Sequence, residues 1–428
     1  MLRISHGHCT AWVVAAFFAA TAPADDWPQF RGPGRDGVWR EVGALAPFPA
    51  EGLKVLWRTP VGIGWSSPIV AEGCVYLCDA QLTKPLAKER VLCFDSSTGM
   101  LRWQYESGVS FPDWAYVHGQ GGGPTATPIF DAGRVYAMGP FGHLHCLYAD
   151  DGSLVWRKNL DEQFDIRLLS VRPSPLIDGN LLIAFIGGLP GASVIAVDKT
   201  TGEIVWKALD DPIANGSPVI ITAGGARQLI VWSAESTASL NPATGEIYWR
   251  EPMTTSTNDA IPTPVALNGR LLVGGLMFAL NPNRPAVTVL WPGIHPEGKR
   301  ILSNTSTAVL QDDYVYSARS GGALVCLDAQ TGAELWSTDA VTERANGASI
   351  HITPVGDQCL LYTDRGDVVL ARLTPQGYDE ISRAHLLEPT TPFGGKKFAW
   401  PPPAFANGCV FARNDEVLVC ARLWKSPN

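Results

Sequence analysis

The stretch of sequence that decides the fold reads Cys93-Phe94-Asp95-Ser96-Ser97-Thr98-Gly99-Met100-Leu101-Arg102-Trp103. It joins an apolar run, an Asp-x-x-Thr-Gly segment and a Trp four residues after the glycine. Close copies begin at Val197, Leu240 and Leu327, and residues 150–156 repeat the second half. Two further copies are degraded: residues 281–291 have a longer turn, and residues 373–381 end in Ile instead of Trp. Self-similarity of this kind indicates a repeat architecture.

The Trp positions give the period of the repeat. They stand at 57, 103, 156, 206, 249, 291 and 336, with Ile381 in the next place, so that neighbours are 42 to 53 residues apart. This is the length of a four-stranded propeller blade. The Asp-x-x-Thr-Gly segment predicts a tight hairpin, because Asp and Thr bond to local amides and Gly takes positive φ without steric cost. The Trp that follows is expected to wedge between its own sheet and the next one.

Each interval also opens with a short signal, in most cases Ser or Thr before proline, that predicts the start of an innermost strand. These starts are Ser67, Thr127, Ser174, Ser217, Thr263, Ser306, His351 and Pro402. The last unit, 401–424, offers three strands, and residues 53–57 offer a single one, so we expect the N-terminal strand to complete the ring and remove its exposed edges. The predicted fold is all-β, an eight-bladed propeller of four-stranded antiparallel blades over residues 53–424.

The composition agrees with a β-rich globular protein and excludes some partners. Hydrophobic residues make up 46% of the chain and charged residues 17%, which favours a packed interior, while 43 Gly and 33 Pro argue against long helices. The formal net charge is −8, and the longest basic run is Lys396-Lys397. Nucleic acid and anionic lipid are therefore not expected as partners.

The N-terminus carries the pattern of an export signal. Arg3 is followed by an apolar stretch, and residues 22–24 read Ala-Pro-Ala, which a signal peptidase accepts. We expect residues 1–24 to be a signal peptide cleaved near Ala24, residues 25–52 to form an N-terminal extension, and the protein to be periplasmic or secreted; the alternative is a buried N-terminal helix.

The apolar stretch is short for a membrane span, and no later stretch reaches that length. Cys9 lies too early to carry the lipid of a lipoprotein, so a lipid anchor is unsupported.

Nine cysteines in an exported protein would suggest disulfides. Their places in the repeat favour small buried fillers instead: Cys93, Cys146, Cys326 and Cys420 share one strand position, and Cys74, Cys359 and Cys409 share another. Disulfides within a blade, Cys78 to Cys93 or Cys409 to Cys420, are left open. His143 and His145 lie on one face of a strand, but no acidic residue at matching spacing supports a metal site.

The Asp-x-x-Thr-Gly-x-x-x-Trp phrase resembles the tryptophan-docking motif of the pyrroloquinoline quinone (PQQ) quinoprotein-like propellers, and the resemblance covers residues 53–424. It implies one of two branches. One contains PQQ- and calcium-dependent alcohol dehydrogenases, and the other contains noncatalytic BamB-like proteins that assist outer-membrane β-barrel assembly. Residues 26–37 also resemble the opening of many exported bacterial PQQ-like proteins. The motif indicates the fold rather than the function, because its residues build the blades.

The dehydrogenase branch implies PQQ stacked on a Trp over the channel, with calcium held by Glu, Asn and Asp and a further Asp as base. Calcium prefers six to eight oxygen ligands, so several acidic or amide side chains must converge. The segments that lead into the innermost strands contain one carboxylate, Asp259, which is the candidate catalytic base. The candidate cofactor- or ligand-binding residues on the same rim are Trp65, His118, Arg172, Asn258, Asn304, Asn346 and Trp400. No metal site is expected.

Two markers of the dehydrogenases are missing from the sequence. There is no adjacent Cys pair, and no C-x-x-C-H for haem attachment. We therefore expect an exported noncatalytic scaffold without a cofactor, which binds an exported protein or a glycan and acts in a BamB-like way. The alternative is a PQQ- and calcium-dependent oxidoreductase that acts on an alcohol or sugar.

Overall fold

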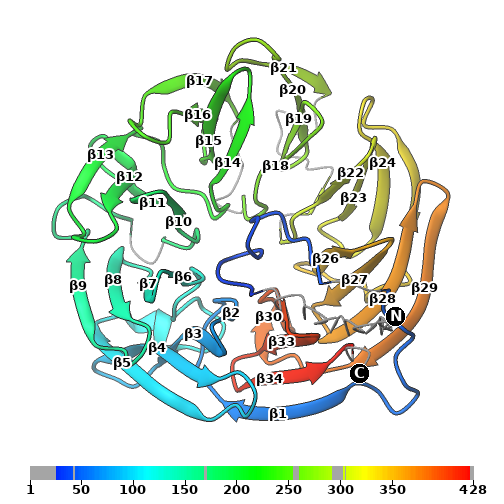
Figure 1. The fold of residues 1–428 in the computed structure, drawn as a ribbon, viewed down its shortest axis with the longest axis horizontal. Helices are drawn as coiled ribbons and strands as arrows, with labels where there is room; N and C mark the ends of the chain where they lie inside the picture. Colours follow the sequence, from blue (N-terminus) through cyan, green and yellow to red (C-terminus); the bar gives the residue numbers. More distant parts are fainter. Residues whose placement is uncertain are drawn as a thin grey trace, which may run out of the picture.

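The computed structural model describes residues 26–41, 44–167, 171–253, 260–291, 302–303 and 305–424. Their strands form eight four-stranded antiparallel sheets, arranged around a central channel like the blades of a propeller (Figure 1). One short 3₁₀ helix, η1 (Asp113–Tyr116), interrupts the strands of the described chain. The prediction of an all-β, eight-bladed propeller is confirmed.

Blades 1 to 7 follow the chain, each from its innermost to its outermost strand. Blade 1 consists of β2 (Ile69–Ala71), β3 (Cys74–Gln81), β4 (Ala87–Asp95) and β5 (Leu101–Val109), and blade 2 of β6 (Ile129–Asp131), β7 (Arg134–Met138), β8 (His143–Tyr148) and β9 (Leu154–Asn159). Blade 3 consists of β10 (Leu176–Asp178), β11 (Leu181–Gly188), β12 (Ala192–Asp198) and β13 (Ile204–Ala208), and blade 4 of β14 (Val219–Ala223), β15 (Ala226–Trp232), β16 (Ser236–Leu240) and β17 (Ile247–Pro252). Blade 5 consists of β18 (Val265–Leu267), β19 (Arg270–Val273), β20 (Leu276–Leu280) and β21 (Val287–Trp291). Blade 6 consists of β22 (Val309–Gln311), β23 (Tyr314–Ala318), β24 (Leu324–Asp328) and β25 (Glu334–Thr338). Blade 7 consists of β26 (Ile350–Val355), β27 (Gln358–Thr363), β28 (Asp367–Thr374) and β29 (Gly377–His385).

Blade 8 joins the two ends of the chain. Its strands are β32 (Ala404–Ala406), β33 (Cys409–Arg413), β34 (Val417–Arg422) and, outermost, β1 (Lys54–Pro60). Strand β1 pairs antiparallel with β34, from Lys54 opposite Arg422 to Pro60 opposite Val417. The predicted closure of the ring by the N-terminal strand is therefore confirmed.

The Ser/Thr-Pro signals mark the innermost strands closely. Ser67, Thr127, Ser174, Ser217 and Thr263 each stand two residues before the first residue of such a strand. In each case the intervening residue is proline, which has no N–H to contribute to a strand pair. All eight innermost strands therefore begin at one mouth of the channel, and the segments that precede them form its rim.

Neighbouring blades are fastened by the repeated tryptophans, as predicted. Six indole Nε1–H groups donate across a blade boundary to a carbonyl in the hairpin turn of the next blade, over 2.8 to 3.1 Å: Trp57 to Ser96, Trp103 to Ala149, Trp156 to Lys199, Trp206 to Pro242, Trp291 to Ala329 and Trp336 to Thr374. In five of these contacts the ring lies directly on the glycine of that turn. Trp249 differs, because its Nε1–H donates to Gln228 of its own blade; the next blade has the degraded turn at residues 281–286.

The cysteines that the structure describes are all buried, and none of them forms a disulfide. Cys93, Cys146, Cys326 and Cys420 each lie on the third strand of a blade, opposite a Tyr or Phe on the second and a Trp on the outermost strand. Their shared position confirms the repeat register, in which a small side chain fits between aromatic ones.

Residues 26–41 cross the central channel, and we call them the N-terminal plug (Figure 1). Trp27 exchanges backbone hydrogen bonds with Val70 of blade 1, and the Trp39 N–H donates to the Pro354 carbonyl of blade 7, 2.9 Å away. Between them the buried Arg35 donates to the carbonyls of Ser174, Pro175 and Pro218, over 2.6 to 3.0 Å. The plug therefore links both sides of the ring (Figure 1).

The contact between tryptophan and glycine can be tested with a matched pair of substitutions in blade 2. Gly133 and Gly152 both have φ above +70°, but a Cβ on Gly152 would lie 2.5 Å from the Trp103 ring, whereas a Cβ on Gly133 meets no atom within 4 Å. Gly133→Ala should lower the free energy of unfolding by about 1 to 2 kcal/mol, the cost of positive φ. Gly152→Ala should cost about 1 to 3 kcal/mol more. Urea unfolding of both variants measures the difference, and equal losses would contradict the docking role of Gly152.

Candidate functional site

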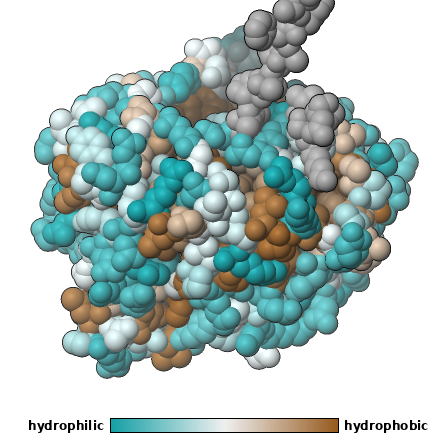
Figure 2. All heavy atoms as spheres, turned by 60° about the horizontal axis from the view of Figure 1, so that its bottom comes forward, coloured by the Kyte–Doolittle hydropathy of each residue, from teal (hydrophilic) through white to brown (hydrophobic). Residues whose placement is uncertain are grey.

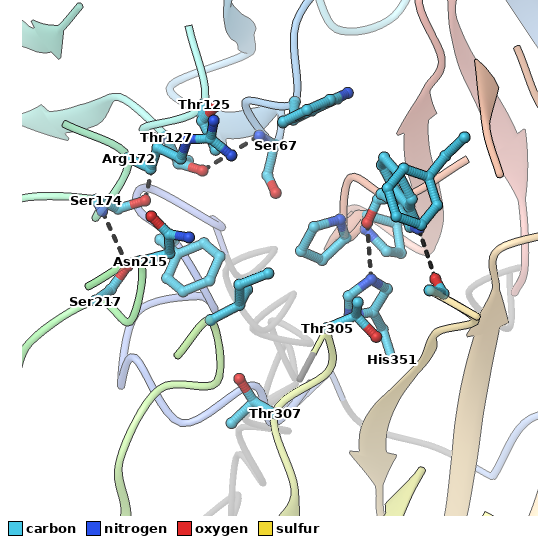
Figure 3. A pocket seen from close by; sticks show the side chains of 18 of the residues that line it. Ser67, Thr125, Thr127, Arg172, Ser174, Asn215, Ser217, Thr305, Thr307 and His351 are labelled. Atoms are coloured by element: carbon cyan, nitrogen blue, oxygen red, sulfur yellow. Dashed lines mark hydrogen bonds between the residues drawn. The ribbon is translucent and has the colours of Figure 1, made fainter. Parts of the chain in front are cut away.

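A cavity of about 760 Å³ occupies the central channel. Its wall combines the N-terminal plug at one end with the loops before the innermost strands at the other, and Figure 3 shows the side chains that converge on it. The plug contributes Trp27, Phe30, Arg31 and Gly37. The cavity is therefore bounded by the N-terminal plug and by the loops that precede the innermost strands, and we call it the cup.

A chain of hydroxyl groups lines this cup. The backbone N–H groups of Ser67, Thr127 and Ser174 donate to the hydroxyl of the corresponding residue in the next blade, which is Thr127, Ser174 and Ser217 in turn, over 2.9 to 3.2 Å (Figure 3). Thr263 makes the same bond to Thr307, at 3.1 Å. Each accepting hydroxyl keeps its own O–H available as a donor, because a hydroxyl carries one donor and two acceptor positions.

Aromatic side chains gather on one side of the mouth. The rings of Trp65 and Trp400 meet edge to face, with centroids 5.5 Å apart, and Trp400 stacks on Phe398 at 5.0 Å. Phe398 and Phe393 belong to a hairpin of β30 (Thr391–Phe393) and β31 (Lys396–Phe398), inserted between blades 7 and 8. The Arg172 guanidinium lies over the Trp65 ring, 5.4 Å from its centroid. The mouth therefore combines flat apolar faces with a positive charge.

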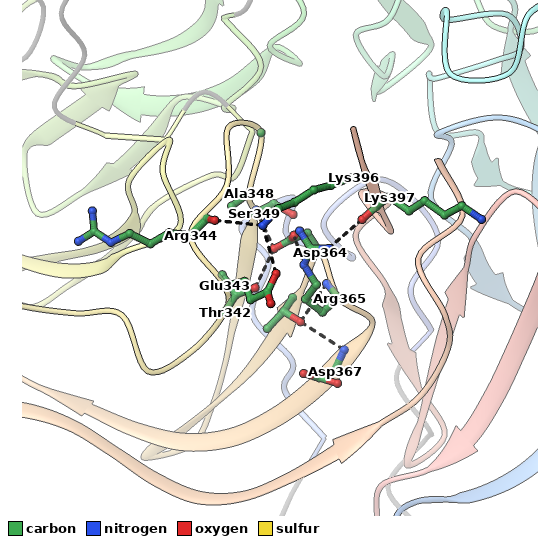
Figure 4. A network of polar contacts seen from close by, with 12 residues as sticks. Thr342, Glu343, Arg344, Ala348, Ser349, Asp364, Arg365, Asp367, Lys396 and Lys397 are labelled. Carbon is green, nitrogen blue, oxygen red and sulfur yellow. Dashed lines mark hydrogen bonds and ion pairs between the residues drawn. The ribbon is translucent and has the colours of Figure 1, made fainter. Parts of the chain in front are cut away.

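The hairpin is fixed to blade 7 by a buried polar network, drawn in Figure 4. The Asp364 carboxylate accepts hydrogen bonds from the Thr342 hydroxyl and the Ser349 N–H, at 3.0 and 3.2 Å. Arg365 donates to the Lys397 carbonyl at 3.0 Å and lies over the Phe398 ring. Burial is the largest influence on Asp364 and raises the pKa of its carboxyl above the ordinary value. The network holds the hairpin against the cup wall.

Two histidines connect the mouth to the blades. The His118 Nε2–H group donates to the Asp415 carboxylate at 2.8 Å, and Asp415 also accepts a hydrogen bond from the Thr391 hydroxyl at the start of the hairpin. His351, at the start of the innermost strand of blade 7, donates from Nε2 to the Trp400 carbonyl at 2.8 Å. Both imidazoles therefore hold loops in place while they line the cup.

The structure brings together five of the candidate residues named from the sequence: Trp65, His118, Arg172, Asn346 and Trp400 all line the cup. Asn258, Asn304 and the candidate base Asp259 lie outside the described residues. Sequence reasoning missed Phe30 and Arg31, and it missed the hairpin that contributes Phe393. The segment with Phe30 and Arg31 resembles the opening of other chains, but nothing in it indicates that it folds into the channel.

The described residues of the cup do not match a calcium site. Its described lining contains two arginines and several amides and hydroxyls, and no Asp or Glu. No cluster of three or more His, Cys, Asp or Glu side chains suited to a metal occurs among the described residues. The two arginines and the Trp faces do fit a flat carboxylated molecule, which describes PQQ chemically.

The burial of His351 gives a prediction about pH. Desolvation lowers the pKa of His351 to about 4, while the unfolded chain titrates near pH 6.5. Between these two pKa values protons bind preferentially to the unfolded state. The stability that neutral His351 gives the folded state is therefore fully present above pH 6.5 and is lost as the pH falls toward 4. The advantage of wild type over His351→Gln in free energy of unfolding should shrink by about 1.4 kcal/mol per pH unit over this range. Urea unfolding at pH 7.5 and 5.5 measures this, and parallel changes in both proteins would contradict it.

Comparisons with known proteins identify both branches of the superfamily. Two curated relatives are BamB of Burkholderia pseudomallei, 26% identical over 52% of this chain and 58% of the relative, and quinoprotein alcohol dehydrogenase PedH of Pseudomonas putida, 27% identical over 33% of this chain and 25% of the relative. The aligned part thus spans just over half of the length of this BamB and a quarter of the length of PedH.

Solved structures show the same fold. BamB from Moraxella catarrhalis has a TM-score of 0.57 at 16% identity, covering 90% of this chain and all of that one. Quinohemoprotein alcohol dehydrogenase from Comamonas testosteroni has a TM-score of 0.61 at 14% identity, covering 96% and 82%. The sequence profile of the family described as outer membrane protein assembly factor BamB matches residues 87–292 and 278–377. The matched profile spans more than half of the chain, which therefore belongs to the BamB family of PQQ-like propellers.

Proposed function

We propose that this protein is an exported, noncatalytic scaffold that holds another exported protein at the loops beside the cup mouth, as part of outer-membrane protein assembly. Membership of the BamB family supports this role and favours a protein as the partner. The pattern of residues 1–24 supports export to the periplasm after cleavage near Ala24. Within the described residues, no helix is long and apolar enough to cross a membrane.

A small apolar unit beside the mouth carries the proposal. The turn between β3 and β4 packs against the segment around η1, with Phe111, Ala115 and Phe141 buried between them. Lys84 and Asp113 pair across this contact at 2.7 Å, and the Tyr116 hydroxyl donates to the Pro85 carbonyl at 2.9 Å. The two segments thus form one unit that is separate from the blade cores.

This unit exposes three large apolar side chains, which we call the rim patch: Leu86, Trp114 and Val117 are 53%, 48% and 56% exposed. Figure 2 shows one face of the molecule, on which hydrophilic residues predominate and hydrophobic residues lie in separate areas. Exposed aromatic side chains on a preformed support are typical of protein-binding surfaces. The rim patch is the observation on which the scaffold function rests.

Photo-crosslinking in the periplasm tests this function. A photoreactive residue at Trp114 should give an adduct with a component or client of outer-membrane protein assembly, and the same residue at Val205 should not. Val205 is the matched control, because it is 53% exposed but lies on β13, on the outer edge of blade 3. Val117→Glu should reduce the adduct about tenfold, since a charge would be buried in the contact. Equal adducts at positions 114 and 205 would argue against the rim patch.

The second candidate is a PQQ-dependent oxidoreductase acting on an alcohol or sugar. It is favoured by Trp65, Trp400 and Arg172 at the cup mouth, and by the similarity to PedH. When bound, PQQ would supply the redox chemistry, with Arg172 placed to hold a carboxylate and Trp65 to stack on the ring. The described cup lining offers no carboxylate ligand for calcium, so these residues account for binding of the quinone and not for its activation by a metal.

Titration with PQQ separates the two candidates. A noncatalytic scaffold should show no calcium-dependent quenching of Trp fluorescence at micromolar PQQ, and no dye-coupled oxidation of a panel of alcohols and sugars. Saturable calcium-dependent quenching with turnover would establish the oxidoreductase instead. In that case the double variant Trp65→Ala, Asp259→Asn should abolish both signals while its circular dichroism remains that of the folded ring.

A further inference from the structure

Two buried thiols of blade 1 lie beside each other on one face of the sheet. Cys93 on β4 stands opposite Tyr76 on β3, and Cys74 comes two residues before Tyr76, so all three side chains point to the same face. The Cys93 thiol donates a hydrogen bond to the Cys74 sulfur. The two cysteines are therefore diagonal neighbours on adjacent strands, with their sulfurs in contact.

The structure distinguishes this pair from the one that the sequence left open. Cys78 stands on the other diagonal from Cys93, because it lies opposite Val91. The Cys78 thiol accepts a hydrogen bond from Ser66, whereas Cys93 interacts with Cys74. The partner of Cys93 is therefore Cys74 and not Cys78.

An arginine is bonded to the Cys74 sulfur. Arg102 on β5 donates from Nη1 to Sγ of Cys74 at 3.1 Å, and its Nη2 group pairs with Asp95 at 2.6 Å. A guanidinium in this place favours a thiolate over a thiol, because a hydrogen bond from a cation to an anionic sulfur is charge-assisted. Blade 8 repeats the diagonal with Cys409 and Cys420, but of these two described pairs the one in blade 1 has the arginine hydrogen bond.

The same contacts decide which of the two thiols ionises first. The hydrogen bond from Cys93 is the largest influence on Cys74 and lowers the pKa of its thiol, with help from Tyr76 and Arg102 and against the effects of burial and Asp95. The pKa of Cys93 is raised, chiefly by its hydrogen bond to Cys74 and then by burial. Cys74 is thus the nucleophile of the pair, and Cys93 keeps its proton.

The position of Cys74 also makes it the first of the two to meet a reagent. It begins β3 directly after the exposed turn at Glu72 and Gly73, and it is 5% exposed, whereas Cys93 is completely buried. A small molecule that reaches this end of blade 1 therefore meets Cys74, and Cys93 lies behind it.

We propose that Cys74 and Cys93 form a reversible disulfide by exchange with a small disulfide such as oxidised glutathione. The Cys74 thiolate attacks one sulfur of the glutathione disulfide and releases a first glutathione; Cys93 then loses its proton and attacks the Cys74 sulfur, which releases a second. The cysteines lose two electrons and two protons in total, and both end on the two molecules of reduced glutathione. The inference goes beyond the scaffold function, because it uses neither the rim patch nor the cup.

The diagonal arrangement explains why the bond would be reversible. Diagonal neighbours in a sheet lie further apart than directly opposite residues. A disulfide between them requires the strands to approach each other, and a disulfide with such strain is more easily reduced. The pair is therefore suited to exchange rather than to permanent cross-linking of blade 1.

Incubation of the purified full chain in glutathione buffers of increasing oxidised fraction tests the pair. After acid quenching, alkylation and proteolysis, mass spectrometry should find the Cys74 peptide linked to the Cys93 peptide, and excess reduced glutathione should separate them. Cys146 is the internal control: it occupies the place of Cys93 in blade 2, where Arg134 stands on the diagonal instead of a cysteine. It should remain a free thiol.

Two matched pairs of variants sharpen the test. Cys74→Ser should leave Cys93 reduced, while Cys78→Ser should leave the linkage unchanged. Arg102→Gln should slow the reaction of Cys74 about threefold or more at pH 7 and move the pH of half-maximal rate upward, because the thiolate is less favoured. Arg372→Gln should change neither; it is the control because both arginine side chains are 46% exposed and each pairs with an aspartate.

Thermal unfolding of each variant reports whether the ring is intact, and the linkage in the wild-type chain decides the proposal even if Cys74→Ser fails to fold. Free Cys74 and Cys93 in the most oxidised buffer would overturn the proposal. A link from Cys93 to Cys78, or a glutathione adduct on Cys74 that Cys93 does not displace, would also overturn it. None of these results alters the crosslinking expected at Trp114, so the two proposals fail separately.

Discussion

The structure depends on one contact made six times, an indole of one blade that lies on the hairpin turn of the next and donates to a carbonyl there. The contact requires glycine in the turn where the approach is closest, since a Cβ on Gly152 or Gly99 would lie within about 2.6 Å of the ring. Each blade is thereby set at a fixed angle to its neighbour. Because the angle is repeated, the eight innermost strands converge, and the cup exists only as a result of that convergence.

The repeated part of the fold could be predicted because its determinants are local. Trp103 and Gly99 belong to one short phrase, and Ser67 marks a strand that starts two residues later. The N-terminal plug could not be predicted in this way. Arg35 is bonded to carbonyls about 140 and 183 residues further along the chain, and no periodic pattern records such a contact. The hairpin with Phe393 was missed for a related reason, because it is an insertion that occurs once.

The candidate site shows the same division. Trp65, His118, Arg172, Asn346 and Trp400 could be named from the sequence because each precedes an innermost strand, and the geometry of a propeller brings all such positions to one mouth. That rule gives their location but not their chemistry. Part of the cup wall comes from outside the repeat, since Trp27, Phe30 and Arg31 belong to the plug. The lining of the channel therefore depends on a segment outside the blades as well as on the blades themselves.

The closure of blade 8 has a consequence for the order in which the chain can fold. Strand β1 precedes all of blades 1 to 7 in the chain, and its partner β34 follows them, so a strand that is synthesised early pairs with one that is synthesised late. The plug also waits for a later part of the chain, since Trp39 donates to Pro354 of blade 7. Until synthesis reaches β34, blade 8 lacks partner strands for β1, which carries Trp57. Blade 8 therefore cannot form until β34 has been synthesised, so the ring closes only after the strands of blades 1 to 7 are available.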